Sequence, residues 1–462
     1  MAKSQAYCPD PRILELGETF YDAVEPADFP MVRERFFNPR HAETVGLAHL
    51  GPDARAAHFG RFEPLPDNLE QPLALRYHGH QFRHYNPDLG DGRGFLFAQL
   101  RDGGGRLLDL GTKGSGQTPW SRRGDGRLTL KGGVREILAT EMLEALGVNT
   151  SKTFALFETG EELWRGDEPS PTRSSVMTRL SHGHIRIGSF QRFAYHEDRG
   201  ALERLTDYAL KHLYGETLAG DAAERAERLF TLVVAATAKL AASYMAAGFV
   251  HGVLNSDNIA ITAESFDYGP WRFTPYWDPG FTAAYFDEAG LYAFARQPEA
   301  IQWDVAQLGG ALSLLCPAER LEVPLNDWGP QFDAAVTCAL LDRLGVAPAE
   351  PDDDRALART LVAALATQAA TIDRVFFDWQ GGVDPGGKAY RDPAFRSLAE
   401  QLAPRGGSRP DGDYWEREDP VAMPIETVEA LWAAIDADDD WQPLDGMVAD
   451  IRRMGAAMVN RA

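Results

Sequence analysis

The pattern of hydrophobic and polar positions differs between the front and the back of the chain. Residues 94–100 (GFLFAQL) and 106–114 (RLLDLGTKG) are short apolar segments on either side of the turn-forming cluster 102–105 (DGGG). This arrangement predicts a β-hairpin. Further strands are predicted near 153–158 and 175–180. The region from about residue 90 to 180 is therefore expected to be rich in strands.

Helical periodicity dominates the later part. Between residues 132 and 147, apolar side chains recur at helical spacing at Val134, Ile137, Leu138, Met142 and Leu146. Gly147 then favours the end of that helix. Four more apolar helices are predicted at 201–213, 222–247, 302–316 and 331–344, and Pro, Gly and Asp clusters predict surface loops at 349–354, 381–387 and 404–413. Strands followed by helices are typical of an α+β fold, which we expect to have two lobes.

These patterns divide the chain into three regions. Residues 1–75 are rich in Pro and aromatic side chains and lack a long periodic segment, so we expect an N-terminal extension that wraps the fold. Residues 76–195 are expected to form the strand-rich lobe, and 196–462 the helical lobe. The apolar run 229–250 is interrupted by Lys239, which favours a buried helix over a membrane span.

Composition narrows the partners. The 462-residue chain has a net charge of −22, which argues against a general nucleic-acid or anionic-membrane surface, because both need clustered Lys and Arg. The first residues lack the apolar core of a signal peptide. Cys8, Cys316 and Cys338 are too widely spaced for a disulfide framework or a zinc pattern. We therefore expect a cytoplasmic protein, whose oligomeric state the sequence does not indicate.

The stretch 251–269 (HGVLNSDNIAITAESFDYG) carries the most distinctive chemistry. Asp257, Asn258 and Asp267 offer hard oxygen ligands of the kind that Mg²⁺ or Mn²⁺ prefers. Short strands are expected at the apolar residues between them, which are Ile259, Ile261 and Phe266. These strands would place the polar side chains in loops at a strand start and a strand end. A plain polar turn between two core segments is the alternative explanation.

The same stretch is comparable with the kinase catalytic loop. His251 and Asn258 keep the spacing of the kinase motif H-R-D-x-x-x-x-N, and Asp267 takes the place of the metal-binding Asp that follows it. The position of the catalytic Asp, however, holds Val253, which cannot accept a proton. Either the site is inactive or another base serves it, and Asp257 is the obvious candidate.

Two copies of the tetrapeptide GDGR, at 90–93 and 124–127, suggest phosphate binding. Glycine lets the backbone N–H groups approach an anion, and Arg93 adds a potentially bidentate contact. Lys113, at the end of the predicted hairpin, offers a point charge. Arg179 and Arg186 could also reach a triphosphate, although surface ion pairing is the commoner use of arginine.

A lysine that binds phosphate in a kinase-like site needs an acidic partner on a helix. The predicted helix at 132–147 offers Glu136, Glu141 and Glu144. Periodicity favours Glu141, which lies among the apolar positions, whereas Glu136 is next to Arg135 and is open to a solvated role. The pattern alone leaves this assignment open.

Other clusters have simpler explanations. Histidines gather at His78, His80, His84, His182 and His184, but no further zinc-type ligands accompany them, so packing and hydrogen bonding beside aromatic rings is expected. The acidic runs 352–354 and 438–440 lack the spacing of a calcium loop and are expected to be solvated.

Several segments, in order and at matching spacing, carry a family resemblance. They are YHGHQF at 77–82, LGDGR at 89–93, TKGSGQTPWSRRGDGR at 112–127, REILATE at 135–141, MTRL at 177–180, IRIGSF at 185–190, HGVLNSDN at 251–258, FDYGP at 266–270 and YAFARQPEAIQWD at 292–304. With these motifs the chain resembles the selenoprotein O (YdiU) family of atypical, kinase-like protein adenylyltransferases. The resemblance implies a protein-kinase-like fold that binds ATP in a flipped orientation with Mg²⁺ or Mn²⁺.

The activity implied is transfer of AMP to Ser, Thr or Tyr hydroxyls of protein substrates with release of pyrophosphate, and UMP transfer from UTP stays open. By resemblance, Asp257 is the proton acceptor, Asn258 and Asp267 are metal ligands, and Glu136 is the partner of the lysine. Nucleotide contacts are implied for Gly90, Gly92, Arg93, Lys113, Asp125, Gly126, Arg179, Arg186 and Asp267. The chain departs from the family after Phe82, where RHYNPD replaces a glycine-rich continuation, and after Pro270, where WRFTP stands.

Two other functions stay open. A phosphotransferase of the aminoglycoside-kinase type also has a loop that begins with His-Gly, although Val253 stands where that group needs Asp. A pseudokinase scaffold would bind nucleotide through Asp267 without any turnover.

Overall fold

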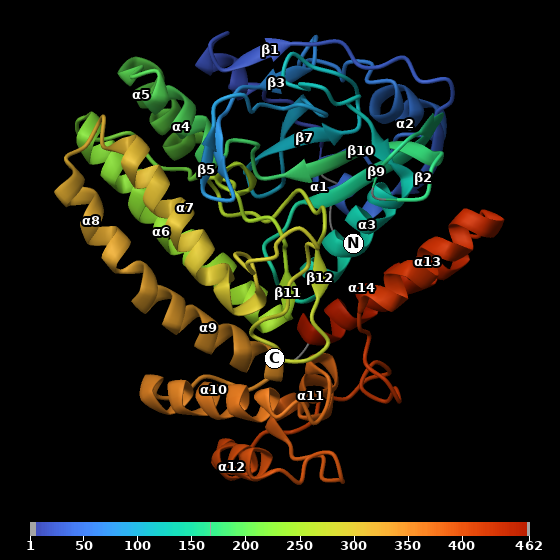
Figure 1. Cartoon of the computed structure of the whole chain (residues 1–462), viewed down its shortest axis with the longest axis vertical. Helices are drawn as coiled ribbons and strands as arrows, with labels where there is room; N and C mark the ends of the chain where they lie inside the picture. The colour runs from blue at the N-terminus through green and yellow to red at the C-terminus, as the bar shows by residue number, and fades with distance from the viewer. Residues whose placement is uncertain (1–5, 167, 460–462) are drawn as a thin grey trace.

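The computed structural model describes residues 6–166 and 168–459, which form a mixed α and β fold (Figure 1). The strands gather in one half of the molecule, and long helices make up most of the other half. The α+β class expected from the sequence is confirmed.

One antiparallel sheet organises the strand-rich half. Its order is β1 (Tyr21–Ala23), β3 (Leu73–Leu75), β6 (Leu96–Arg101), β7 (Leu107–Lys113), β10 (Thr172–Ser181), β9 (Lys152–Leu163) and β2 (Arg33–Phe37), with β8 (Leu128–Thr129) on β10. The predicted hairpin is β6–β7, with Leu100 opposite Leu108, and Lys113 ends its second strand as expected. The first 75 residues add strands to both edges of this sheet and carry the short helices α1 (Pro39–Thr44) and α2 (Pro52–Arg55).

Helix α3 (Leu130–Ala145) is the predicted helix that follows the second GDGR turn, and it packs on β9 and β10. The Thr129 side chain caps its start by accepting from the Gly132 N–H. Gly147, with φ of +79°, lies just past its end. Val134, Ile137, Leu138 and Met142, which set the helical period, are all fully buried.

The helical half is built around α6 (Ala222–Ala247). Asp221 and Glu224 form a reciprocal cap at its start, and Gly248 ends it with φ of +68°. The helix is long and apolar enough to span a membrane by length and composition, but 67% of its most apolar window is buried in the protein, as expected for a core helix. The other helices are α4 (Ile187–Tyr195), α5 (Arg199–Tyr208), α7 (Gln297–Leu312), α8 (Ala318–Asn326), α9 (Trp328–Leu344), α10 (Pro351–Ala366), α11 (Ile372–Asp378), α12 (Pro393–Leu402), α13 (Ile425–Asp438) and α14 (Gln442–Val459).

The acidic runs are not simply solvated loops. The predicted loop 349–354 is wrong from Pro351 onward, because α10 begins there. The three aspartates lie in the first turn of α10, where negative charge is favourable at the positive end of the helix dipole. Asp354 is buried and lies 2.7 Å from Arg405. In the second run, Asp439 directly follows α13 and pairs with Arg35 and Arg173, at 2.9 and 2.7 Å. Spacing along the chain could not reveal these distant arginines.

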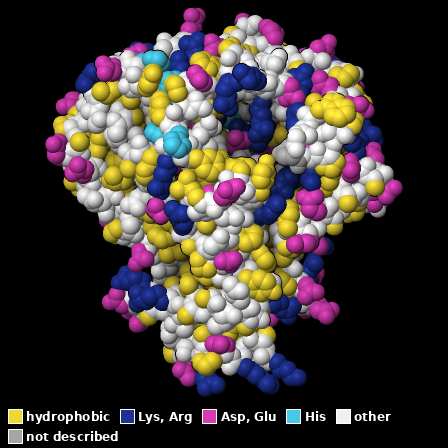
Figure 2. All heavy atoms as spheres, viewed as in Figure 1, with side chains coloured by type: hydrophobic (Ala, Val, Ile, Leu, Met, Phe, Trp, Pro, Cys, Tyr) yellow, Lys and Arg dark blue, Asp and Glu magenta, His cyan; other side chains and the backbone are white. Residues whose placement is uncertain are grey.

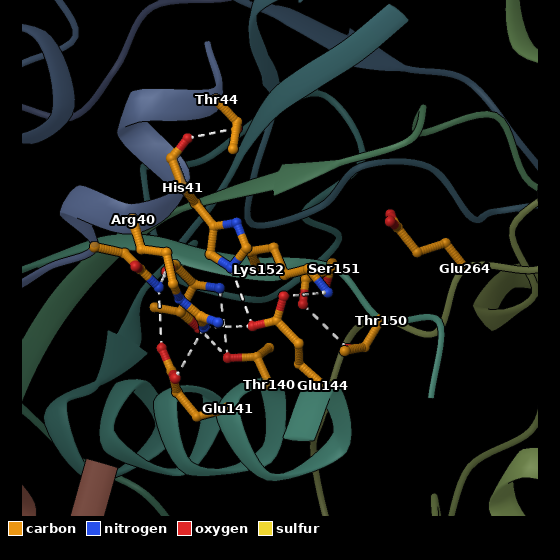
Figure 3. Close-up of polar contacts among 12 residues, drawn as sticks. Arg40, His41, Thr44, Thr140, Glu141, Glu144, Thr150, Ser151, Lys152 and Glu264 are labelled. Carbon is orange, nitrogen blue, oxygen red and sulfur yellow. Dashed lines mark hydrogen bonds and ion pairs between the residues drawn. The ribbon is translucent and has the colours of Figure 1, made fainter. Parts of the chain in front are cut away.

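Two acids of α3, Glu141 and Glu144, tie the helix to other parts of the chain (Figure 3). Glu141, which periodicity favoured as a functional residue, is buried and lies 2.6 Å from Arg452 of α14. Glu144 contacts Arg40, His41 and Lys152. Both glutamates therefore anchor the helix, and the acid of α3 that pairs with Lys113 of β7 is Glu136.

Candidate functional site

A cleft of about 720 Å³ is lined by β7, the two GDGR turns, β10 and the turn that contains Asp257. This volume suits a small-molecule site. Figure 2 shows a hollow bordered by Lys and Arg side chains in the strand-rich half of the molecule. The cleft brings together nearly every site residue expected from the sequence, namely Gly90, Gly92, Arg93, Lys113, Asp125, Gly126, Arg179, Arg186, Asp257, Asn258 and Asp267.

Asp257 and Asn258 lie in a short 3-10 turn (Ser256–Asn258) that follows β11 (Phe249–Val250). The expected strands at Ile259, Ile261 and Phe266 are wrong. This segment makes only isolated backbone bonds with residues 185–187, in which the Ile187 N–H donates to the Ile259 carbonyl and the Ile261 N–H to the Ile185 carbonyl, at 3.0 and 2.9 Å, while the side chains of Ile259 and Ile261 are buried in the core. The functional side chains are thus held by an irregular segment.

Asp257 is 7% exposed, and its Oδ1 has no hydrogen-bond partner within the described part of the chain. The Arg186 guanidinium donates to the backbone carbonyl of Asp257 at 3.0 Å. Burial raises the pKa of the Asp257 carboxyl to about 6, although Arg186 opposes that shift. A buried carboxylate with a free oxygen can accept a proton from a group that enters the cleft. Val253 lines the same cleft without offering such a group.

Lys113 is buried and contacts two acids. Its Nζ pairs with Glu136 of α3 and lies 2.6 Å from Oδ1 of Asp267. Glu136 is 1% exposed, so the solvated role that its neighbour Arg135 had suggested is wrong. Burial alone would raise the pKa of Asp267, but Lys113, Arg93 and Arg179 hold it well below its usual range. Asp267 is therefore ionised at neutral pH.

Arg179 of β10 and Arg186, just before α4, are buried in the cleft wall instead of pairing at the surface. The Arg179 guanidinium lies 5.1 Å from the centre of the Phe266 ring, and its Nη1, which has no hydrogen bond to any described residue, is 3.8 Å from Asp267. Arg186 stacks on Tyr77 at 4.1 Å and pairs with Asp91 at 3.2 Å. Rings fix both guanidinium groups in place, which prepares them for an anionic ligand.

The first GDGR turn leaves no room for side chains. A Cβ on Gly90 would lie 2.4 Å from the Trp120 ring, and one on Gly92 would lie 2.8 Å from the Trp120 carbonyl. In the second turn Gly126 has φ of +71°, and Asp125 pairs with Arg165 at 2.8 Å. Glycine is thus required at these positions by space and by backbone conformation.

Sequence reasoning missed several residues of the cleft. Arg122 and Arg123 line the cleft. Like Arg93, they form no ion pair with any described residue. Trp164 lines the other side and is 73% exposed. The two arginines directly precede the second GDGR turn, which was an available signal, whereas nothing in the local sequence marks Trp164.

Ligands for a metal ion are limited. No group of three or more His, Cys, Asp or Glu side chains suited to a metal is found in residues 6–166 and 168–459. Asn258 and Asp267 supply two oxygen donors on the cleft wall, and the Asn258 amide donates to the Val253 carbonyl at 3.0 Å, which leaves its oxygen available. This donor set fits a hard cation such as Mg²⁺, which normally keeps waters and substrate phosphates as its other ligands.

Three of the five histidines serve packing and hydrogen bonding, as expected, whereas His84 is exposed and the buried Nε2 of His182 has no hydrogen-bond partner among the described residues. His78 and the Tyr85 hydroxyl lie 2.7 Å apart, and His80 lies 2.7 Å from the Gln191 amide. His184 pairs with buried Asp109 at 3.1 Å.

A cation-lined cleft with a buried lysine–glutamate pair, two glycine turns and a carboxylate oxygen without a partner among the described residues is suited to a phosphorylated ligand. The family model described as protein adenylyltransferase SelO matches residues 5–396, and the chain belongs to that family. Curated relatives called protein nucleotidyltransferase YdiU include those of Gloeobacter violaceus, 42% identical over 96% of this chain and 95% of the relative, and Synechocystis sp., 40% identical over 96% and 97%. One from Vibrio cholerae is 35% identical over 74% of this chain and 68% of the relative. The protein is accordingly an enzyme of the nucleotidyltransferase class.

Proposed function

We propose that the protein transfers AMP from ATP to Ser, Thr or Tyr hydroxyls of protein substrates and releases pyrophosphate. The observation that carries this proposal is the free Oδ1 of Asp257 in the same cleft as Arg93, Lys113 and Arg179. A base and a cluster of cations are the two components that attack of a hydroxyl on a nucleotide phosphate requires.

The scaffold proposed for this chemistry is a two-lobed, protein-kinase-like fold, with lobes at 76–195 and 196–462 and the first 75 residues as an extension. It is supported by the pair between Lys113 on β7 and Glu136 on α3, since kinases orient their phosphate-binding lysine in this way. Asp267, after the Asp257 turn, takes the place of the kinase metal ligand.

In the proposed reaction the acceptor hydroxyl attacks the α-phosphorus while Oδ1 of Asp257 takes its proton. The bond from the α-phosphorus to the oxygen of the leaving diphosphate breaks. Arg93, Lys113 and Arg179 then stabilise the negative charge on pyrophosphate. Asn258 and Asp267 are the residues that would hold Mg²⁺ or Mn²⁺, which when bound would reduce the charge of the phosphates.

Transfer of UMP from UTP is a second candidate. Trp164 offers an exposed ring on the cleft wall, and stacking on a ring accepts purines and pyrimidines alike. The acidic chain and its separate cysteines further support a cytoplasmic enzyme whose partners are proteins, without nucleic acid or membranes.

The test compares ATP labelled at the α-phosphate with ATP labelled at the γ-phosphate, in the presence of Mg²⁺ or Mn²⁺. We expect label on protein from the α position only, together with release of pyrophosphate. Label from the γ position alone would make the protein a phosphotransferase. Nucleotide binding without transfer of either label would make it a scaffold.

A further inference from the structure

The loop between β12 (Arg272–Phe273) and α7 exposes two neighbouring aromatic side chains. Tyr285 is 80% exposed and Phe286 is 47% exposed. Water contact with so much aromatic surface is unfavourable, and exposed apolar patches on soluble proteins commonly mark binding sites.

These two rings continue inward as a row. The ring centres of Tyr285 and Phe286 are 5.1 Å apart, those of Phe286 and Phe82 are 5.9 Å apart, and those of Phe82 and Tyr292 are 5.1 Å apart. We call the four residues the aromatic ledge. It runs from the exposed ring of Tyr285 to the buried ring of Tyr292, so its inner end is held by the packed interior.

The inner end of the ledge is bonded to the catalytic turn. The Phe82 N–H and the Tyr292 hydroxyl both donate to Oδ1 of Asn255, at 3.0 and 2.7 Å. Asn255 is two residues from Asp257. The loop that carries the outer rings also lies close to the segment before this turn, because a Cβ on Gly252 would lie 3.0 Å from the Ala283 Cβ.

The ledge also continues from the wall of the cleft. Gln81 lines the cleft and directly precedes Phe82, in the hairpin formed by β4 (Gly79–Gln81) and β5 (His84–Asn86). The backbone of Gly79 lies against Asp257, since a Cβ there would be 2.9 Å from the Asp257 Cβ. The hairpin that carries Phe82 is therefore next to the proposed base.

The turn of this hairpin is held in an unusual conformation. Phe82 and Arg83 have φ of +49° and +63°, in the left-handed region that side chains other than glycine rarely adopt. Contacts hold both residues there, through Asn255 for Phe82 and through Glu299, at 2.9 Å, for Arg83. Strain of this kind persists where the surroundings fix a functional position.

We infer that the aromatic ledge binds the acceptor segment of the protein substrate through a large apolar side chain next to the modified hydroxyl. The inference rests on the proposed function, because it needs a protein hydroxyl to reach Asp257. Aromatic rings at a rigid, partly exposed site bind apolar side chains of a partner with little loss of conformational entropy. The ledge would thus select the acceptor, while the cleft binds the nucleotide.

The test uses synthetic peptides with one Thr, flanked by Phe, Leu or Gly, and ATP labelled at the α-phosphate. We expect the wild type to prefer the Phe and Leu peptides over the Gly peptide by about tenfold in kcat/KM. The double variant Tyr285→Ser/Phe286→Ser should lose this preference through a higher KM, with unchanged ATP affinity. Tyr285→Phe/Phe286→Leu should restore it, and Val323→Ser, an exposed apolar residue on α8, should behave as wild type.

The outcomes separate the two proposals. Equal use of all three peptides by the wild type, or an unchanged preference in the double variant, overturns the ledge and leaves adenylylation intact. A wild type that transfers no α-label to any peptide or protein overturns the proposed function, and the ledge with it. A wild type that is dimeric in sedimentation and a double variant that is monomeric, with the same peptide preference, would instead assign the ledge to a second copy of this chain.

Discussion

Lys113 Nζ lies 2.6 Å from Oδ1 of Asp267, and its other ion-pair partner is Glu136 on α3. One side chain therefore connects the end of β7, a helix and the irregular segment that carries the proposed metal ligand. Lys113 and Glu136 are almost completely buried. Burial makes unpaired charges costly. The stability of this region and the geometry of the cleft therefore both depend on Lys113.

Replacing Lys113 by methionine should destabilise the fold. The change keeps the length of the side chain but leaves the buried carboxylate of Glu136 without its partner, which we expect to cost about 3–5 kcal/mol. Urea unfolding measures the loss. The double variant Lys113→Met/Glu136→Gln should recover part of it, because no buried charge is then left alone. Equal losses in the single and double variants would show that the two residues are not coupled.

Asp257→Asn should abolish transfer while nucleotide binding persists. The amide keeps the shape of the side chain but cannot take the proton of an acceptor, so we expect kcat to fall about 10²- to 10⁴-fold. ATP affinity, measured by calorimetry, should change little because the cations that hold the phosphates are untouched. Asp88→Asn, on an exposed loop near the first GDGR turn, is the matched control. Full transfer by Asp257→Asn would exclude this residue as the base.

The parts that local pattern predicted well are those stabilised by local contacts. The β6–β7 hairpin follows from two apolar segments around a turn-forming cluster, α3 follows from a helical period, and both were expected at nearly the observed bounds. The sequence indicated Lys113, Arg93 and the glycine turns as candidate phosphate-binding residues, because few residue types can contact a phosphate in this way. Family motifs then supplied the role of Glu136, which periodicity alone had not favoured.

The remaining features depend on contacts that no local pattern carries. Glu136 and Glu141 are both buried because the sheet covers one side of α3 and α14 covers another, and Arg452 lies 311 positions after Glu141. Likewise Ile259 and Ile261 looked like strand residues because they are apolar, yet they are buried in the core on an irregular segment that makes only isolated backbone bonds near Ile185. Trp164 is visible as a site residue only once β9 is placed beside the cleft.

Trp164→Ala should weaken nucleotide binding through the base. Stacking of a base on an aromatic ring contributes about 1–3 kcal/mol, so we expect the Kd for ATP and for UTP to rise about 5- to 150-fold. Inorganic tripolyphosphate, which has no base, should bind both proteins equally. Trp164→Phe should retain most of the affinity. Equal weakening for tripolyphosphate would instead show that the substitution disturbs the cationic wall.

Stability should fall at low pH partly through Glu144. Burial would raise the pKa of this carboxyl, but His41, Lys152 and Arg40 lower it from 4.5 to about 2. A folded-state pKa below the unfolded one stabilises the fold above about pH 4.5, and this contribution is lost as pH falls towards 2. Glu144→Gln should therefore cost about 2 kcal/mol at pH 7 and much less near pH 2. Urea unfolding at several pH values measures this, with Glu43→Gln on the exposed face of α1 as the control. A constant difference between Glu144→Gln and wild type across this range would show that the carboxyl keeps its ordinary pKa in the folded protein.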